Sequence, residues 1–135
     1  MKLTREQVIT TVKSAHGNGE IPNLHLADLW GIDLTEANLQ GVNLSRAYLR
    51  RANLSQANLQ GTNLGEADLS AADLRGANLR QAKLGGIDLH EADLRQADLS
   101  ETDLRGANLR RAKFNDNTLW PANFDPIEEG AIRSG

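Results

Sequence analysis

The sequence predicts an all-β fold, a right-handed quadrilateral β-helix whose parallel coils stack into a solenoid behind a short amino-terminal helix. Leu, replaced by Phe at the last position, recurs at every fifth residue from Leu29 to Phe114. Ala stands two residues before this central residue in 13 of the 18 units, and Asp or Asn stands directly before it in 15. A period of five matches neither the turn of an α-helix nor the two-residue alternation of a flat strand, so the chain has to bend after each unit.

Each five-residue unit forms one straight side of a coil, with its Ala and Leu pointing inward. Residues two apart in extended backbone point the same way, so the Asp or Asn between them faces outward. The fifth residue turns the corner, and Gly occupies several of these positions, where a positive φ is useful. Four corners close a ring, so one coil takes about twenty residues, and the 18 units build about 4.5–5 coils. The parallel connections favour right-handed winding.

The Asp and Asn residues before the central positions recur in nearly every unit, which indicates a structural role at the turns. Such side chains bond nearby backbone groups in tight bends. A catalytic or metal-binding array is the alternative interpretation. The coil stacks Asp73 beside Asp93, which could hold Ca²⁺, but the flanking Arg75 and Arg95 would repel the ion. A mutual ladder of charges is therefore the favoured interpretation of these four residues.

Residues 1–20 are expected to cover the amino-terminal end of the solenoid, which would otherwise expose its core and open strand edges. Thr4 and Gln7 have the spacing of a capping box, and Leu3 and Val8 have that of a hydrophobic staple. The sequence predicts a helix from Arg5 to His16. Its apolar stripe consists of Val8, Ile9, Val12 and Ala15.

The repeat fades after Phe114. Leu119, Trp120 and Phe124 are expected to cover the last coil, and the tail from Ile127 to Gly135 is expected to be loose. The predicted organisation is a helical cap over residues 1–21, a β-helix over 22–116, and a closing segment with a flexible tail over 117–135.

The units Ala37-Asn38-Leu39-Gln40-Gly41, Ala52-Asn53-Leu54-Ser55-Gln56 and Ala92-Asp93-Leu94-Arg95-Gln96 resemble the A(D/N)LXX signature of the pentapeptide-repeat family. The resemblance covers about residues 24–114 and implies a right-handed quadrilateral β-helix. It also implies a cyanobacterial origin, because the family is abundant there. The strongest functional analogy is to quinolone-resistance proteins that mimic DNA and bind DNA gyrase. Such mimicry needs a long acidic stripe, whereas Arg interrupts every acidic column of this chain.

Composition narrows the classes of function. The net charge of −3 argues against direct binding of nucleic acid. The chain has no Cys, no apolar run of membrane-spanning length and no secretory signal, so a cytoplasmic protein without membrane association is expected. His16, His25 and His90 lie on the helix and on different faces and have no metal-ligand spacing. We expect no cofactor, no metal and no catalytic residue.

The best candidate for a binding surface combines Trp30, Tyr48 and the basic pair Arg50-Arg51. Exposed Trp and Tyr are enriched at interaction hot spots. The favoured alternative for Trp30 is that it packs beneath the amino-terminal helix. A second candidate is a bare patch made by Gly65, Gly85, Gly86 and Gly106, where another backbone could approach closely.

These observations predict a non-enzymatic module for protein–protein interaction or scaffolding, with an unknown protein partner, that is a monomer or an end-to-end dimer. The alternative is a DNA-mimicking inhibitor or protector of DNA gyrase.

Overall fold

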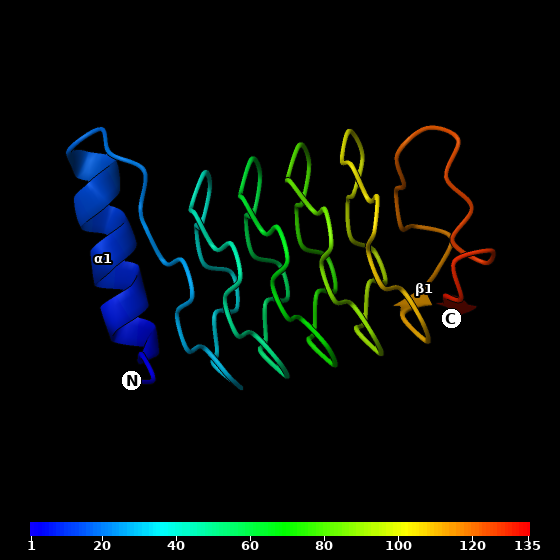
Figure 1. Ribbon diagram of the computed structural model, residues 1–135, viewed down its shortest axis with the longest axis horizontal. Coiled ribbons are helices and arrows are strands. Elements are labelled where there is room, and N and C mark those ends of the chain that lie inside the picture. The colour runs from blue at the N-terminus through cyan, green and yellow to red at the C-terminus, as the bar shows by residue number, and fades with distance from the viewer.

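The computed structural model describes all residues 1–135 and consists of stacked coils with a helix at one end (Figure 1). Helix α1 spans Arg5–Gly17, strand β1 spans Lys113–Phe114 and strand β2 spans Ile132–Arg133. α1 lies across the first coil at the amino-terminal end of the long axis, and the carboxyl-terminal segment lies at the opposite end (Figure 1). The helix is too short and too polar to span a bilayer.

The coils pair in parallel with a repeat of twenty residues. Asp33 pairs with Asn53, Asn53 with Asp73, and Asp73 with Asp93, and the other three sides follow the same register. The N–H of most central residues donates to the next coil, as Leu34 N does to Asn53 O at 2.8 Å. Each side contributes one paired residue instead of a long strand, because the chain bends after every five residues. The twenty-residue coil with four sides is thus confirmed.

The interior is filled by the repeated Leu and Ala residues. Leu54 and Leu79, at the middle of the series, are 0% and 1% exposed. Thr62 replaces an inward Ala and is fully buried, with its hydroxyl donating to Leu59 O at 2.8 Å. Each buried Leu contributes about 1.5–3 kcal/mol relative to an exposed one, so this column is the main source of stability.

The turns are closed by the Asp and Asn side chains, as the sequence predicts. In all 15 units that carry Asp or Asn, its Oδ1 accepts the N–H of the residue two positions later, for example Thr35 N to Asp33 Oδ1 at 3.0 Å. The corner residue that follows has a positive φ even where it is not Gly, as in Arg51 (62°) and Glu66 (58°). Its N–H reaches the next coil, as Arg51 N does to Ser70 O at 3.0 Å, and this bond offsets the left-handed conformation.

The amino-terminal segment covers the open carbonyls of the first coil. The capping box of Thr4 and Gln7 is present, and Val8 and Val12 are buried against the coil. Arg5 Nη1 and Nη2 donate to the carbonyls of Asp33 and Thr35 at 2.9 and 3.0 Å. Further donors are the N–H of Leu3 to Asp28 O at 3.1 Å and Nε2 of His16 to Gln40 O at 2.9 Å. These carbonyls would otherwise have no preceding coil to bond.

The closing segment departs from the predicted register. Asp98 pairs with Leu119 instead of residue 118, so this coil has one residue more than the others. Leu119 therefore faces outward and is 54% exposed, and the expectation that it covers the core is wrong. Thr118 fills the inward position, with its hydroxyl donating to Leu94 O at 2.9 Å. Trp120 and Phe124 do pack on the core, and Trp120 stacks on Phe124 with ring centroids 5.2 Å apart.

The tail is not loose as expected, because its backbone continues the solenoid. β2 pairs in parallel with β1, with Ile132 opposite Lys113. Ile132 N donates to Ala112 O and Ser134 N to Phe114 O, both at 2.7 Å. Ala131 is 5% exposed and joins the core. The tail thus covers the open edge beyond Phe114.

Candidate functional site

The coil brings the four predicted residues Trp30, Tyr48, Arg50 and Arg51 together, and we call them the aromatic–basic patch. Trp30 and Arg50 occupy the same position in successive coils. The coils are joined at this corner by Gly31 N, which donates to Arg50 O at 2.8 Å. Tyr48 pairs with Asp28, two residues before Trp30. The stacking alone therefore makes neighbours of residues twenty apart.

Trp30 is not packed beneath α1, contrary to the favoured expectation. Its exposed fraction is 49%. Lys2 places its Nζ 5.1 Å from the centroid of the indole ring, in cation–π geometry. The backbone of Lys2 is held there because it pairs with Asp28 as an additional strand residue. The indole therefore lies at the edge of the helical cap, where another molecule can reach it.

Tyr48 stands at a position where 15 of the 18 units carry Asp or Asn, and the other two carry Lys83 and Lys113. Its ring cannot accept the N–H of Arg50, which consequently lacks the side-chain acceptor found in the 15 regular units. Tyr48 is 53% exposed, so the substitution does not add a fully buried group to the core. The residue gives up a local hydrogen bond and presents an aromatic ring to solvent.

A shallow hollow of about 340 Å³ lies beside Tyr48. Its lining consists of Leu26, Arg46, Ala47, Tyr48, Glu66 and Asp68. Leu26 is 50% exposed and occupies a corner with a φ of 63°, where the other units carry a polar residue, Gly or, at Ala71, a small apolar residue. Three exposed apolar side chains, those of Leu26, Trp30 and Tyr48, thus surround Asp28.

The contributions of Leu26 and Lys2 were not predicted from the sequence. Leu26 could have been, because a large apolar residue at a solvent-facing corner departs from the pattern of the repeat. Lys2 could not, because nothing in the sequence shows that the chain before α1 pairs with the first coil.

The two arginines of the patch lie at the corner that follows Tyr48. Arg50 Nη1 donates to Ser70 Oγ at 3.4 Å, and the Arg51 side chain makes no hydrogen bond or ion pair. Arg51 lines a second hollow of about 380 Å³, which extends along this corner to Arg111 and to the tail residues Ile132, Arg133 and Ser134. The basic part of the patch is therefore free to bind an anionic group.

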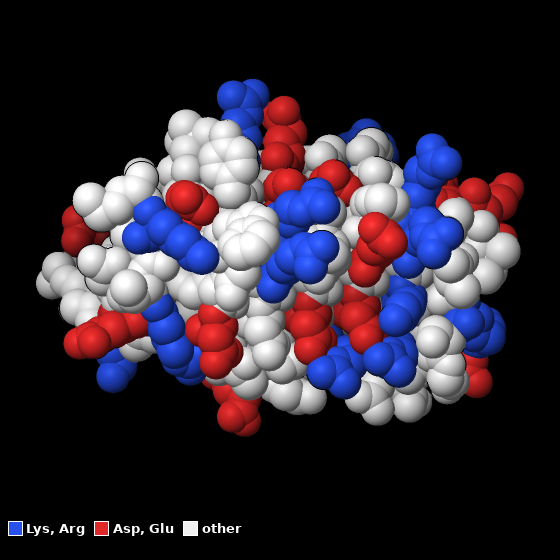
Figure 2. All heavy atoms as spheres, turned by 90° about the horizontal axis from the view of Figure 1, so that it is seen from below, with Lys and Arg blue, Asp and Glu red and all other residues white.

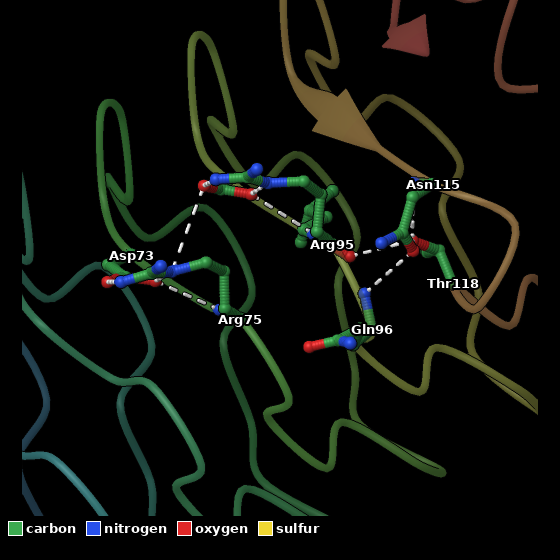
Figure 3. A network of polar contacts seen from close by, with 8 residues as sticks. Asp73, Arg75, Arg95, Gln96, Asn115 and Thr118 are labelled. Carbon is green, nitrogen blue, oxygen red and sulfur yellow. Dashed lines mark hydrogen bonds and ion pairs between the residues drawn. The ribbon is translucent and has the colours of Figure 1, made fainter. Parts of the chain in front are cut away.

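The acidic column of Asp73 and Asp93, in contrast, is neutralised by neighbouring arginines. Arg75 and Arg95 bind Asp73 and Asp93 at 2.7 and 2.6 Å, and Arg75 Nε also lies 3.9 Å from Asp93 Oδ2 (Figure 3). The hydrogen bond from Arg75 lowers the pKa of Asp73. Burial opposes ionisation of Asp93, but the hydrogen bonds from Arg95 prevail and lower its pKa as well.

The distribution of charge over the surface follows from this pairing. Seen from below, basic and acidic side chains alternate along the molecule, and no long stripe of one sign forms (Figure 2). The charge ladder predicted for these columns is present in the structure.

The glycine patch has no side chains, and its backbone follows the same turns as the other units. Gly86 and Gly106 have positive φ values of 70° and 76°, which favour glycine at these corners. Gly65 and Gly85 have no such requirement, and other units carry Ser, Thr or Arg at their position. The patch extends to the carboxyl-terminal end of the solenoid.

Comparison with known proteins gives one family. The model of pentapeptide repeats matches in eight copies, over residues 23–56, 52–90 and 87–117. A search of the curated proteins gives no match.

Three solved structures of cyanobacterial pentapeptide repeat proteins are similar. Rfr23 from Cyanothece 51142 is 39% identical, with a TM-score of 0.69 over 70% of this chain and 64% of that one. The protein alr5209 from Nostoc PCC 7120 is 35% identical, with a TM-score of 0.52 over 94% and 95%. HetL, a protein of Nostoc sp. strain PCC 7120 involved in the regulation of heterocyst differentiation, is 31% identical, with a TM-score of 0.56 over 84% and 58%. The chain thus spans less than two thirds of Rfr23 and of HetL.

Proposed function

We propose, since the chain belongs to the pentapeptide-repeat family, that it is a non-enzymatic module that binds another protein through the aromatic–basic patch. The observation that carries this proposal is Tyr48. At this position the chain forgoes the turn-closing acceptor of the repeat and exposes a ring beside Trp30. Giving up local stability for an exposed aromatic pair is typical of a surface under selection for binding.

The side chains of the patch predict the chemistry of the partner surface. Leu26, Trp30 and Tyr48 offer an apolar centre, each about half exposed. Lys2 and the Arg50-Arg51 pair lie at its margin, and Arg51 has no carboxylate partner in this chain. Interfaces of this kind have an apolar core and a polar rim. The partner surface is therefore expected to present an apolar group surrounded by Asp or Glu.

Affinity capture with matched variants tests the proposal. The patch variant carries Trp30→Ala and Tyr48→Asn, and Asn is the residue that the repeat normally uses at that position. The control carries Arg110→Ala, which stands in the column of Arg50 but three coils away and lines neither hollow. A protein retained by the wild type and by the control but lost by the patch variant supports the proposal. Equal retention by all three, with folding verified by circular dichroism, contradicts it.

The DNA-mimicking alternative is less well supported. Mimicry requires a continuous acidic stripe to meet a basic groove, whereas Asp73 and Asp93 are each bound by an Arg of this chain. We expect no inhibition of gyrase supercoiling at micromolar concentrations of the protein. Inhibition in that range would favour the mimic over the interaction module.

Further parts of the proposal rest on the family and on the sequence. We infer right-handed winding with about 4.5–5 coils, a cytoplasmic location, a cyanobacterial origin, and a monomer or end-to-end dimer that uses no cofactor. The role of HetL in regulation supports a regulatory binding function over a catalytic one.

A further inference from the structure

The direction of hydrogen bonding along the solenoid determines what each end exposes. Within the coils, the N–H groups of the central and corner residues donate toward the carboxyl-terminal end, as Leu34 N and Glu36 N do to Asn53 O and Ser55 O. The first coil therefore has open carbonyls, which Leu3, Arg5 and His16 satisfy. The last coil has open N–H groups at the central and corner positions, beside carbonyls of the inward residues such as Ala112 O, which accepts Ile132 N.

The closing segment satisfies these N–H groups on some sides only. Leu99 N donates to Leu119 O at 2.7 Å, Arg111 N donates to Gly130 O at 2.9 Å, and β2 pairs with the side at Phe114. The N–H of Leu109 has no acceptor, but the corner of the same side is covered, because Arg111 N bonds to Gly130 O.

One side remains open along its whole length. We call residues 102–106 the last rung, since they form the final copy of the side that contains Leu64 and Leu84. Neither Leu104 N nor Gly106 N has a backbone or side-chain acceptor, although Leu104 is only 8% exposed. An unpaired edge of this kind is a ready template for another strand.

The last rung is also weakly joined to the coil before it. In the preceding copy, Leu64 N donates to Lys83 O and Lys83 N to Thr62 O, both at 2.9 Å. In the last copy the only backbone bond across this side is Gly86 N to Arg105 O at 3.1 Å. The rung is thus unpaired on its outer edge and held on its inner edge by this bond and the bridge between Lys83 and Asp103.

A groove of about 500 Å³ lies directly against this edge. One wall is the rung with Leu104 and Ala107, and the other is formed by residues 121–124 with Phe124. Glu129 lies at the rim and makes no ion pair, whereas Asp103 is bound by Arg105 at 2.6 Å. The groove therefore combines the apolar side chains of Leu104, Ala107 and Phe124 with open N–H donors and one free carboxylate.

We propose that the last rung binds an extended segment of a partner protein, which adds to the solenoid as one more parallel strand. Its carbonyls would accept the N–H groups of Leu104 and Gly106, its central apolar side chain would enter the groove, and a Lys or Arg would face Glu129. This site is distinct from the aromatic–basic patch and does not depend on it.

A second copy of the chain does not satisfy the same edge. Stacked in the same direction, a second copy would have to meet this edge with its first coil. The complementary carbonyl edge of a second copy is occupied by its own α1 segment, through Leu3, Arg5 and His16. A separate extended segment with free carbonyls is therefore the occupant that fits.

The probe is an acetylated and amidated peptide of residues 81–86, Gln-Ala-Lys-Leu-Gly-Gly, which forms the same side one coil earlier. It is titrated to millimolar concentration into ¹⁵N-labelled protein. We expect the amide resonances of Leu104 and Gly106 to shift and their hydrogen exchange to slow. Unchanged amides at both residues, or equal shifts with a peptide whose Leu is replaced by Asp, would overturn the proposal.

Charge reversal distinguishes a specific site from non-specific adhesion. Glu129→Lys should weaken binding of the probe about two- to five-fold, and a probe with Glu in place of its Lys should restore it. The matched control is Glu128→Lys, an exposed neighbour that does not line the groove and should leave affinity unchanged. Loss of affinity in both variants, without rescue, would contradict the proposal. So would shifts of the same amides with protein concentration alone, since these would indicate self-association.

Discussion

Lys83→Asn should stabilise the protein, because it supplies a hydrogen bond that the repeat uses almost everywhere else. Lys83 is exposed, forms no ion pair and stands where 15 other units carry Asp or Asn. The N–H of Gly85, two residues later, has no acceptor. In the copy before, Asn63 Oδ1 accepts the N–H of Gly65 at 3.0 Å. The new Asn should form the same bond to Gly85.

The expected gain is that of one intramolecular hydrogen bond, about 0.5–1.5 kcal/mol in the free energy of unfolding. For a chain of this length, this corresponds to a rise of about 2–5 °C in the melting temperature. Urea denaturation followed by circular dichroism measures the free energy, and thermal unfolding provides a second reading. Lys83→Ala is the control, since it removes the same side chain without adding an acceptor.

The difference between the Asn and Ala variants isolates the turn. If Lys83→Asn is no more stable than Lys83→Ala, the side-chain acceptor contributes nothing and the reasoning fails. That result would also weaken the interpretation of Tyr48, which assumes that an aromatic residue at this position sacrifices stability. Asn63→Ala provides the reciprocal measurement and should lose about as much as Lys83→Asn gains.

Three further predictions concern the core, the charge ladder and the helix. Leu74→Asp should abolish folding, because it buries an unpaired charge at a fully enclosed position, whereas Arg75→Ala should cost less than about 1 kcal/mol; similar losses in urea denaturation would contradict the assignment of inside and outside. The lowered pKa of Asp73 contributes stability above its unfolded pKa of about 3.9, which is lost as the pH falls through the folded value. Wild type should therefore exceed Asp73→Asn in stability at pH 7, and this advantage should shrink as the pH falls below about 3.9; an advantage that does not shrink below that pH would refute the assignment. Thr4→Ala removes the cap of α1 and should cost about 1 kcal/mol, measured by thermal unfolding against Thr10→Ala, an exposed helix position expected to show no comparable cap loss.

Regular parts of the fold could be predicted because each unit carries the same local information. The inward Leu54, the turn at Asp33 and the capping box at Thr4 each depend on residues within one unit or one helical turn. Stacking then repeats these local solutions every twenty residues. Proximity of Trp30 to Arg50 follows from the same rule.

The irregular parts could not be predicted in this way. One additional residue before Leu119 reverses which side chains face the core, and the five-residue count continues through it without a visible break. The pairing of the tail with Lys113 depends on how the closing segment folds back, and residues 127–135 carry no repeat that would indicate it.

The interior of this protein follows from its repeat, because a period of five allows only one arrangement that keeps every Leu in one core. The ends and the surface depend instead on contacts between distant segments. Whether Trp30 lies under α1 or in solvent, and whether Leu104 N–H finds an acceptor, depend on where non-repeating segments settle against the outermost coils. Alternative placements of these segments differ by small free energies of burial and hydrogen bonding. A local pattern of residues therefore does not predict which placement is adopted.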